Sequence, residues 1–140
     1  MPRLLIHSFR LSVAVVAVLL SSSFARSQEP ACPPDLSGHW RGSWESCASG
    51  HRGPLAARFE KIDDCQYLVH FHGRAFKAFP FYYSVTLTIS GYEGDTVFLT
   101  ASRHLPIFGN FECSASANSC GFEARYSAAS DNGQFHLDRK

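Results

Sequence analysis

The chain has 140 residues, of which 45% are hydrophobic and 14% aromatic, and its formal net charge at pH 7 is +1. This length predicts a single domain, and the many aromatic side chains are enough for a sizeable core. A charge so close to zero argues against a nucleic-acid-binding protein, which would carry a strongly basic face, so we expect no nucleic acid partner.

Residues 1–27 have the pattern of a secretory signal peptide. Arg3 and Arg10 give a basic start, residues 11–20 form an apolar run, and small residues follow at 21–25. A signal peptide is removed on export, and this apolar run is shorter than the roughly 20 residues that span a bilayer. We therefore expect an exported protein, periplasmic or secreted. The alternative is a retained helix that anchors the protein to a membrane.

The expected mature chain begins after residue 27. Residues 1–27 hold three of the basic residues and no acid, which leaves 10 Lys and Arg against 12 Asp and Glu, a net charge of −2. Residues 28–36 are rich in proline and are expected to be an extended lead-in. The remaining residues, 37–140, are expected to form one domain.

That domain is expected to be all-β. Apolar and polar residues alternate with a period of two in eight runs: 39–45, 55–61, 66–72, 81–89, 96–101, 110–115, 120–127 and 133–139. Alternation with short connections indicates antiparallel strands paired in chain order. About eight such strands can close into an up-and-down barrel, and a two-sheet sandwich is the alternative.

In an up-and-down barrel, alternate connections lie at the same end. One end would collect the connections 46–54, 73–80, 102–109 and 128–132, which are both basic and aromatic. Clustered cations concentrate anions, and arginine can hold a carboxylate or phosphate with two hydrogen bonds. We expect a small amphipathic or anionic ligand here, unless these loops are simply solvated. The expected ligand-binding residues are His51, Arg52, Arg74, Phe76, Lys77, Phe79, Arg103, His104 and Phe108.

The five cysteines favour disulfides in an exported domain. Cys113 and Cys120 flank a predicted turn and would face each other on inward positions, so we expect them to pair. Cys32 and Cys65 are expected at one end of the barrel and form the second predicted pair. Cys47 would then be free or would link two chains. Other pairings stay open, because two bridges among five cysteines can be arranged in many ways.

No catalytic or metal-binding motif is found. His70 and His72 share a face, but a metal site needs a further ligand, and none is predicted nearby. Cys47 and His51 could form a thiol and base, yet no third residue orients them. The sequence has no phosphate loop, zinc-protease helix or serine elbow. We expect no enzyme activity, no cofactor and no metal.

The first predicted strand is preceded by Leu36 and opens with Gly38-His39-Trp40, a G-x-W motif. This start resembles the calycins, the superfamily of lipocalins, fatty-acid-binding proteins and avidin-like barrels. The resemblance implies that Trp40 packs across a closed barrel base, beneath a cationic residue from the last strand. Arg139 is the matching residue, since it shares a face with the apolar residues of that strand.

The resemblance covers both ends of the domain and little between them. The wider pattern of GxWxGxW, GHRGPL and PFYYSVTL resembles small uncharacterised exported bacterial proteins and implies no activity. The expected function is binding of a small ligand at the basic end. The alternatives are a protein-binding module, such as a protease-inhibitor-like barrel that uses residues 30–34, and a structural component of the cell envelope.

Overall fold

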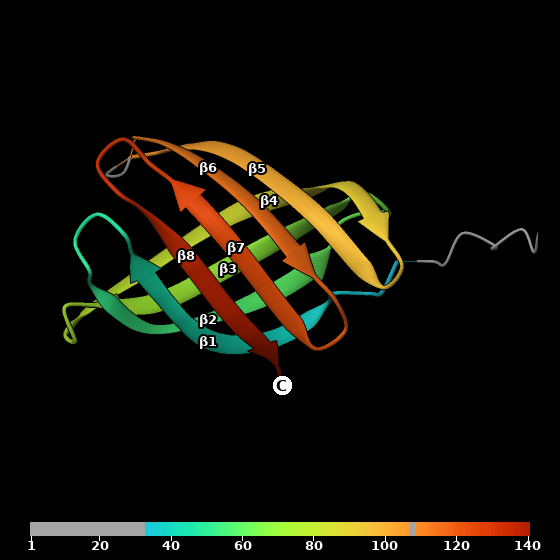
Figure 1. The fold of residues 1–140 in the computed structure, drawn as a ribbon, viewed down its shortest axis with the longest axis horizontal. Coiled ribbons are helices and arrows are strands. Elements are labelled where there is room, and N and C mark those ends of the chain that lie inside the picture. Colours follow the sequence, from blue (N-terminus) through green and yellow to red (C-terminus); the bar gives the residue numbers. More distant parts are fainter. Residues whose placement is uncertain (1–32, 107–108) are drawn as a thin grey trace, which may run out of the picture.

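A computed structural model describes residues 33–106 and 109–140 (Figure 1). The predicted signal peptide and most of the lead-in lie outside this range. The strands are β1 (Gly38–Ser46), β2 (Arg52–Lys61), β3 (Gln66–Ala75), β4 (Phe79–Glu93), β5 (Thr96–Leu105), β6 (Gly109–Ala117), β7 (Gly121–Ser127) and β8 (Asn132–Arg139). Each pairs antiparallel with the next, and β8 pairs with β1, so the sheet is a closed barrel. The predicted all-β barrel is confirmed and the sandwich is excluded.

The alternation read from the sequence gives the two faces of the barrel wall. In β1, for example, Trp40 and Trp44 face the core, whereas His39 and Arg41 are exposed. The main departure is the length of β4, which continues past residue 89, where the predicted run ends, and stops only at Glu93. A bulge between Ile89 and Gly91 shifts its pairing with β5, and such a bulge lets a strand bend without ending.

The base of the barrel is closed by the segment that leads into β1. Leu36 and Trp40 are fully buried there, and the Trp40 indole nitrogen donates a 2.9 Å hydrogen bond to the Leu36 carbonyl. The guanidinium of Arg139 lies over the Trp40 ring and donates hydrogen bonds to the carbonyls of Asp35 and Ser37. The predicted packing of Arg139 on Trp40 is confirmed, and Leu36, the last residue of the expected extended lead-in, is part of the base. We call this end the closed end.

At the opposite end, called the open end, β4 and β5 separate. Their pairing runs only from Thr88 and Thr100 to the turn between them. Nearer the open end, β4 pairs with β3, and β5 pairs with β6. Arg103 of β5 bridges this seam by donating a hydrogen bond to the carbonyl of Ser84 on β4. Strands β4 and β5 are therefore joined by backbone hydrogen bonds toward the closed end and by the Arg103 side chain toward the open end.

The predicted Cys113–Cys120 disulfide is wrong. Strand β6 runs two residues further than predicted, so Cys113 pairs in register with Tyr126, and Cys120 lies exposed in the turn before β7. Across residues 33–106 and 109–140, no two cysteines form a disulfide. Cys32 lies outside the described residues, so its pairing with Cys65 remains a prediction. In the same described part of the chain, no helix has the length and apolar character needed to cross a membrane.

Candidate ligand-binding site

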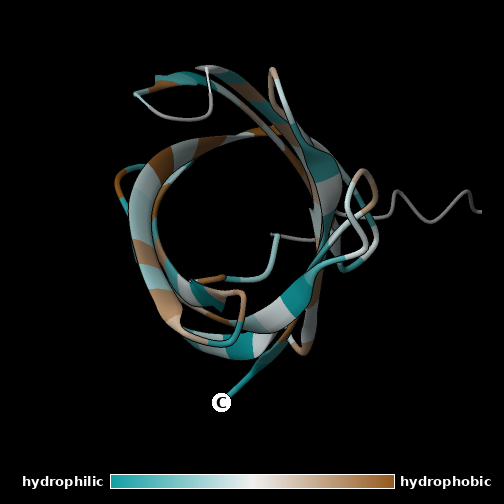
Figure 2. Cartoon of the chain, turned by 90° about the vertical axis from the view of Figure 1, so that its left-hand side faces the viewer, coloured by the Kyte–Doolittle hydropathy of each residue, from teal (hydrophilic) through white to brown (hydrophobic). Residues whose placement is uncertain are grey.

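A cavity of about 490 Å³ lies inside the barrel at the open end. Figure 2 looks into this end, along the ring formed by the strands. The cavity walls are mostly apolar and aromatic, as in most sites for small organic ligands. The aromatic residues that the strands contribute to the walls are Trp44, Phe81, Tyr83, Phe111, Tyr126 and Phe135.

Five aromatic rings form a closed belt around the inside of the barrel. The ring centroids of Tyr83 and Phe111 are 5.8 Å apart, those of Phe111 and Tyr126 are 6.0 Å apart, and those of Tyr126 and Phe135 are 4.9 Å apart. Phe71 completes the circle at 5.5 Å from Phe135 and 5.1 Å from Tyr83. These spacings are those of favourable aromatic pairs. We refer to these five residues as the aromatic belt.

Below the belt the barrel is filled. The ring of Phe59 lies 5.5 Å from that of Trp40 and 5.2 Å from that of Phe122, and all three side chains are buried. The cavity therefore occupies only the half of the barrel nearest the open end. A compact ligand fits this space, whereas a long acyl chain could not extend down the barrel axis.

Polar groups at the mouth of the cavity hold two loops together. Asp131, in the β7–β8 turn, accepts a 2.5 Å hydrogen bond from the Ser46 hydroxyl and a 2.9 Å hydrogen bond from the Tyr126 hydroxyl. Ser49, in the β1–β2 loop, donates to the Ser46 hydroxyl at 2.9 Å. Burial raises the pKa of Tyr126, and the neighbouring Asp131 carboxylate raises it further, so the phenol stays neutral. This network fixes one side of the mouth.

Tyr83 is the other tyrosine of the belt. Burial raises its pKa well above the ordinary value, and nearby Cys113 and Tyr126 add to this effect. Burial likewise raises the pKa of the Cys113 thiol to about 12. The interior around the belt therefore disfavours charge, which suits the apolar part of a ligand.

Of the nine predicted ligand-binding residues, the eight that the structure describes lie at the open end, but few of them line the cavity. His51 and Phe76 border it, with ring centroids 4.3 Å apart. Arg103 lies at the seam between β4 and β5. Phe108 is outside the described residues. None of the other five lines the cavity, and all are exposed toward the open end, with Arg52 and Arg74 on outward positions of their strands: Arg52, Arg74, Lys77, Phe79 and His104.

Most of the cavity wall was missed by the sequence analysis. It considered the loops, whereas the belt comes from inward positions of five strands. The available signal was the position of each inward aromatic residue along its strand. Tyr83, Phe111, Tyr126 and Phe135 all lie in the half of a strand that points to the open end.

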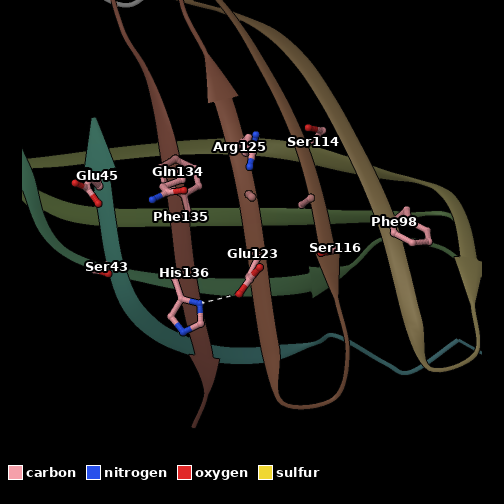
Figure 3. A pocket seen from close by; sticks show the side chains of 12 residues that line it. Ser43, Glu45, Phe98, Ser114, Ser116, Glu123, Arg125, Gln134, Phe135 and His136 are labelled. Carbon is pink, nitrogen blue, oxygen red and sulfur yellow. Dashed lines mark ion pairs between the residues drawn. The ribbon is translucent and has the colours of Figure 1, made fainter. Parts of the chain in front are cut away.

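A second hollow, of about 550 Å³, lies on the outer wall across β1, β8, β7 and β6. Figure 3 shows that the labelled residues around it are mostly polar, and except for Phe135, which faces the core, they are on outward positions of the strands. His136 lies 3.4 Å from a Glu123 carboxylate oxygen and 3.7 Å from one of Asp138. These groups are exposed and partnered with one another, so the open-end cavity is the stronger candidate.

The two histidines considered as metal ligands have other partners. His70 makes a 2.7 Å hydrogen bond between its Nδ1 atom and the Ser84 hydroxyl, and its Nε2 atom lies 3.9 Å from Glu60. The His72 ring stacks on that of Tyr82 at 6.0 Å. Within the part of the chain that the structure describes, no group of three His, Cys, Asp or Glu side chains is placed to hold a metal ion.

The fold of this chain is similar to that of known solved structures. No protein-family model and no curated protein matches the chain. The solved structure of EF1p2_mFAP2b bound to DFHBI is similar, with 16% identity, a TM-score of 0.55 and coverage of 75% of this chain and 94% of that one. A de novo designed fluorescence-activating β-barrel has 12% identity, a TM-score of 0.54 and coverage of 74% and 92%. The chain thus shares the β-barrel fold of these two structures.

Proposed function

We propose that this protein binds a small amphipathic molecule in the open-end cavity. The observation that carries the proposal is a cavity of about 490 Å³ that is lined by four of the five belt residues and opens at the cationic end of the barrel. Burial of apolar ligand surface against these rings is worth about 25 cal/mol per Å². One barrel of similar fold is bound to a small molecule, DFHBI, which supports this use of the fold.

The chemistry of the mouth favours an anionic group on that ligand. Arg52, Arg74 and Lys77 lie exposed at the same end of the barrel, and no ion pair involves them among the described residues. Cations at a mouth raise the local concentration of anions. We propose a compact ligand whose rings or short apolar chain enter the belt while a carboxylate, sulfonate or phosphate stays at the rim. On the sequence pattern of residues 1–27, we also propose that the protein is exported.

Titration with the fluorescent amphipathic anion anilinonaphthalene sulfonate (ANS) tests this proposal. Ala75 lines the cavity, and Ala75→Phe would place a ring in it. Ala56 faces outward on the neighbouring strand β2 and does not line the cavity, so Ala56→Phe is the matched control. We expect saturable binding that Ala75→Phe weakens about tenfold or more and Ala56→Phe leaves unchanged. If the two variants bound ANS equally well, the cavity would not be the binding site.

A further inference from the structure

The β3–β4 hairpin at the open end carries exposed aromatic side chains. Phe76 is 61% exposed, Phe79 67% and Tyr82 77%. In Figure 1 the tip of this hairpin extends beyond the strands at the open end. Neighbouring apolar side chains left in water in this way mark a surface that contacts another molecule.

The tip is also held in an unusual backbone conformation. Phe76 and Lys77 have φ angles of 51° and 64°, and the Ala78 amide donates a 3.2 Å hydrogen bond to the Ala75 carbonyl. This two-residue turn normally uses asparagine and glycine, because other residues are strained at positive φ. Strain of this kind concentrates at functional sites. Here it places a large apolar side chain and a cation at the outermost point of the hairpin.

The hairpin tip and the neighbouring β1–β2 connection carry charge of one sign, and the acid at the mouth, Asp131, accepts hydrogen bonds from Ser46 and Tyr126. The hairpin adds Arg74 and Lys77, and the neighbouring β1–β2 connection adds Arg52. Residues 46–54 and 73–80 contain no Asp or Glu. Glu45 is the nearest acid along β1, and it pairs in register with Arg52 on the barrel wall.

We propose that this hairpin docks the open end of the barrel on an anionic lipid surface. Phe76 and Phe79 would enter the boundary between headgroups and acyl chains, where aromatic side chains are favoured, and Arg74 and Lys77 would meet the headgroups. The rings of Phe76 and Phe79 are 6.5 Å apart and nearly perpendicular, at 81°. They form one small edge-to-face cluster at the tip, and the cations beside this cluster favour an anionic lipid surface as the partner.

Docking in this orientation would turn the mouth of the cavity toward the lipid. Phe76 belongs to both the tip and the cavity lining. A membrane-derived amphiphile would then reach the belt without crossing water. Docking itself does not depend on an occupied cavity, so it is a separate property from the proposed ligand binding.

Co-sedimentation with lipid vesicles tests the proposal. We expect the protein to pellet with vesicles of phosphatidylcholine and phosphatidylglycerol but not with phosphatidylcholine alone, and to be released by salt. Phe79→Ser should weaken vesicle binding about tenfold, since it removes one of the rings that would be buried in the lipid. Phe98→Ser is the matched control, because Phe98 is 40% exposed on the outer wall and lies near the closed end.

Charge reversal gives a second, independent comparison. Lys77→Glu should abolish pelleting, whereas Lys61→Glu, at the closed end, should bind like the wild type. The proposal would be overturned if the hairpin variant and its control had equal effects on pelleting, either for the Phe79 and Phe98 pair or for the Lys77 and Lys61 pair. Failure of the wild type to pellet with anionic vesicles would also overturn it and would favour a protein partner for the tip. Ala128→Phe would place a ring in the cavity from the β7–β8 turn and leaves the hairpin untouched. It should lose ANS binding but pellet normally, so the failure of docking and the failure of ligand binding can be told apart.

Discussion

The guanidinium carbon of Arg139 lies 5.3 Å from the centroid of the Trp40 ring. Trp40 is near the start of the first strand and Arg139 ends the last, so this contact joins the two strands whose pairing closes the barrel. The same guanidinium donates to the Asp35 carbonyl at 2.9 Å and to that of Ser37. One side chain therefore fastens the entering segment, the first strand and the last strand together.

Replacing Arg139 tests the importance of this fastening. Arg139→Ala removes a cation–π contact and two charged hydrogen bonds, so we expect the free energy of unfolding to fall by about 1–3 kcal/mol. Arg125→Ala, on the exposed outer face of β7, is the control and should change it by less than about 0.5 kcal/mol. Urea denaturation followed by tryptophan fluorescence measures both, and equal stabilities would show that the contact is incidental.

Much of the barrel could be predicted from alternation alone. The period of two placed Trp40 and Trp44 inward and put Arg139 on the matching face of the last strand. The length of β4 could not be read in this way, because Ser90 and Gly91 are typical turn residues. They continue the strand because a bulge between Ile89 and Gly91 lets β4 bend with the closed sheet.

The cavity was harder to predict, because it depends on which inward side chains meet across the barrel. Toward the closed end, large rings such as those of Phe59 and Phe122 meet and fill the space. Toward the open end, several inward positions are small. A Cβ atom at Gly133, for example, would lie 2.7 Å from the Tyr126 ring. Such packing across strands leaves no local pattern in the sequence.

Gly42 provides a sharp test of the register between β1 and β8. A Cβ atom there would lie 1.8 Å from the His136 carbonyl oxygen, whereas one at Gly91 would meet nothing within 4 Å. Gly42→Ala should therefore destabilise the barrel by about 3 kcal/mol, and Gly91→Ala should have little effect. Thermal unfolding distinguishes them, and a Gly42→Ala variant of wild-type stability would mean that the two strands pair differently.

The cysteines should differ in reactivity. Burial raises the pKa of Cys113 to about 12, so its thiol stays protonated and shielded at pH 8, whereas Cys47 and Cys120 are exposed. We expect iodoacetamide to label Cys47 and Cys120 within minutes and Cys113 only after unfolding. Peptide mapping without reductant should show no Cys113–Cys120 link, and the same map reports whether Cys32 and Cys65 are joined.

Tyr126 of the aromatic belt predicts how the stability of the barrel changes at alkaline pH. Because burial raises the pKa of Tyr126 above its ordinary value of 10.0, the folded state holds the phenol proton more tightly than the unfolded chain. Its contribution to stability is full below pH 10 and is lost as the pH rises above that value. Tyr126→Phe should lower stability at pH 7, because the hydrogen bond to Asp131 is lost, yet flatten the decline above pH 10. Urea midpoints across this pH range measure both effects. If the stability of Tyr126→Phe fell above pH 10 as steeply as that of the wild type, the Tyr126 phenol would be in contact with water.

The most direct test of ligand binding inside the barrel is solution NMR of the protein with ANS. Binding in the aromatic belt predicts intermolecular NOEs from the ANS rings to the ring protons of Phe111, Tyr126 and Phe135, and their loss in Ala75→Phe. NOEs confined to the exposed Phe79 or to the outer wall near Phe98, with the belt signals unchanged, would contradict the account.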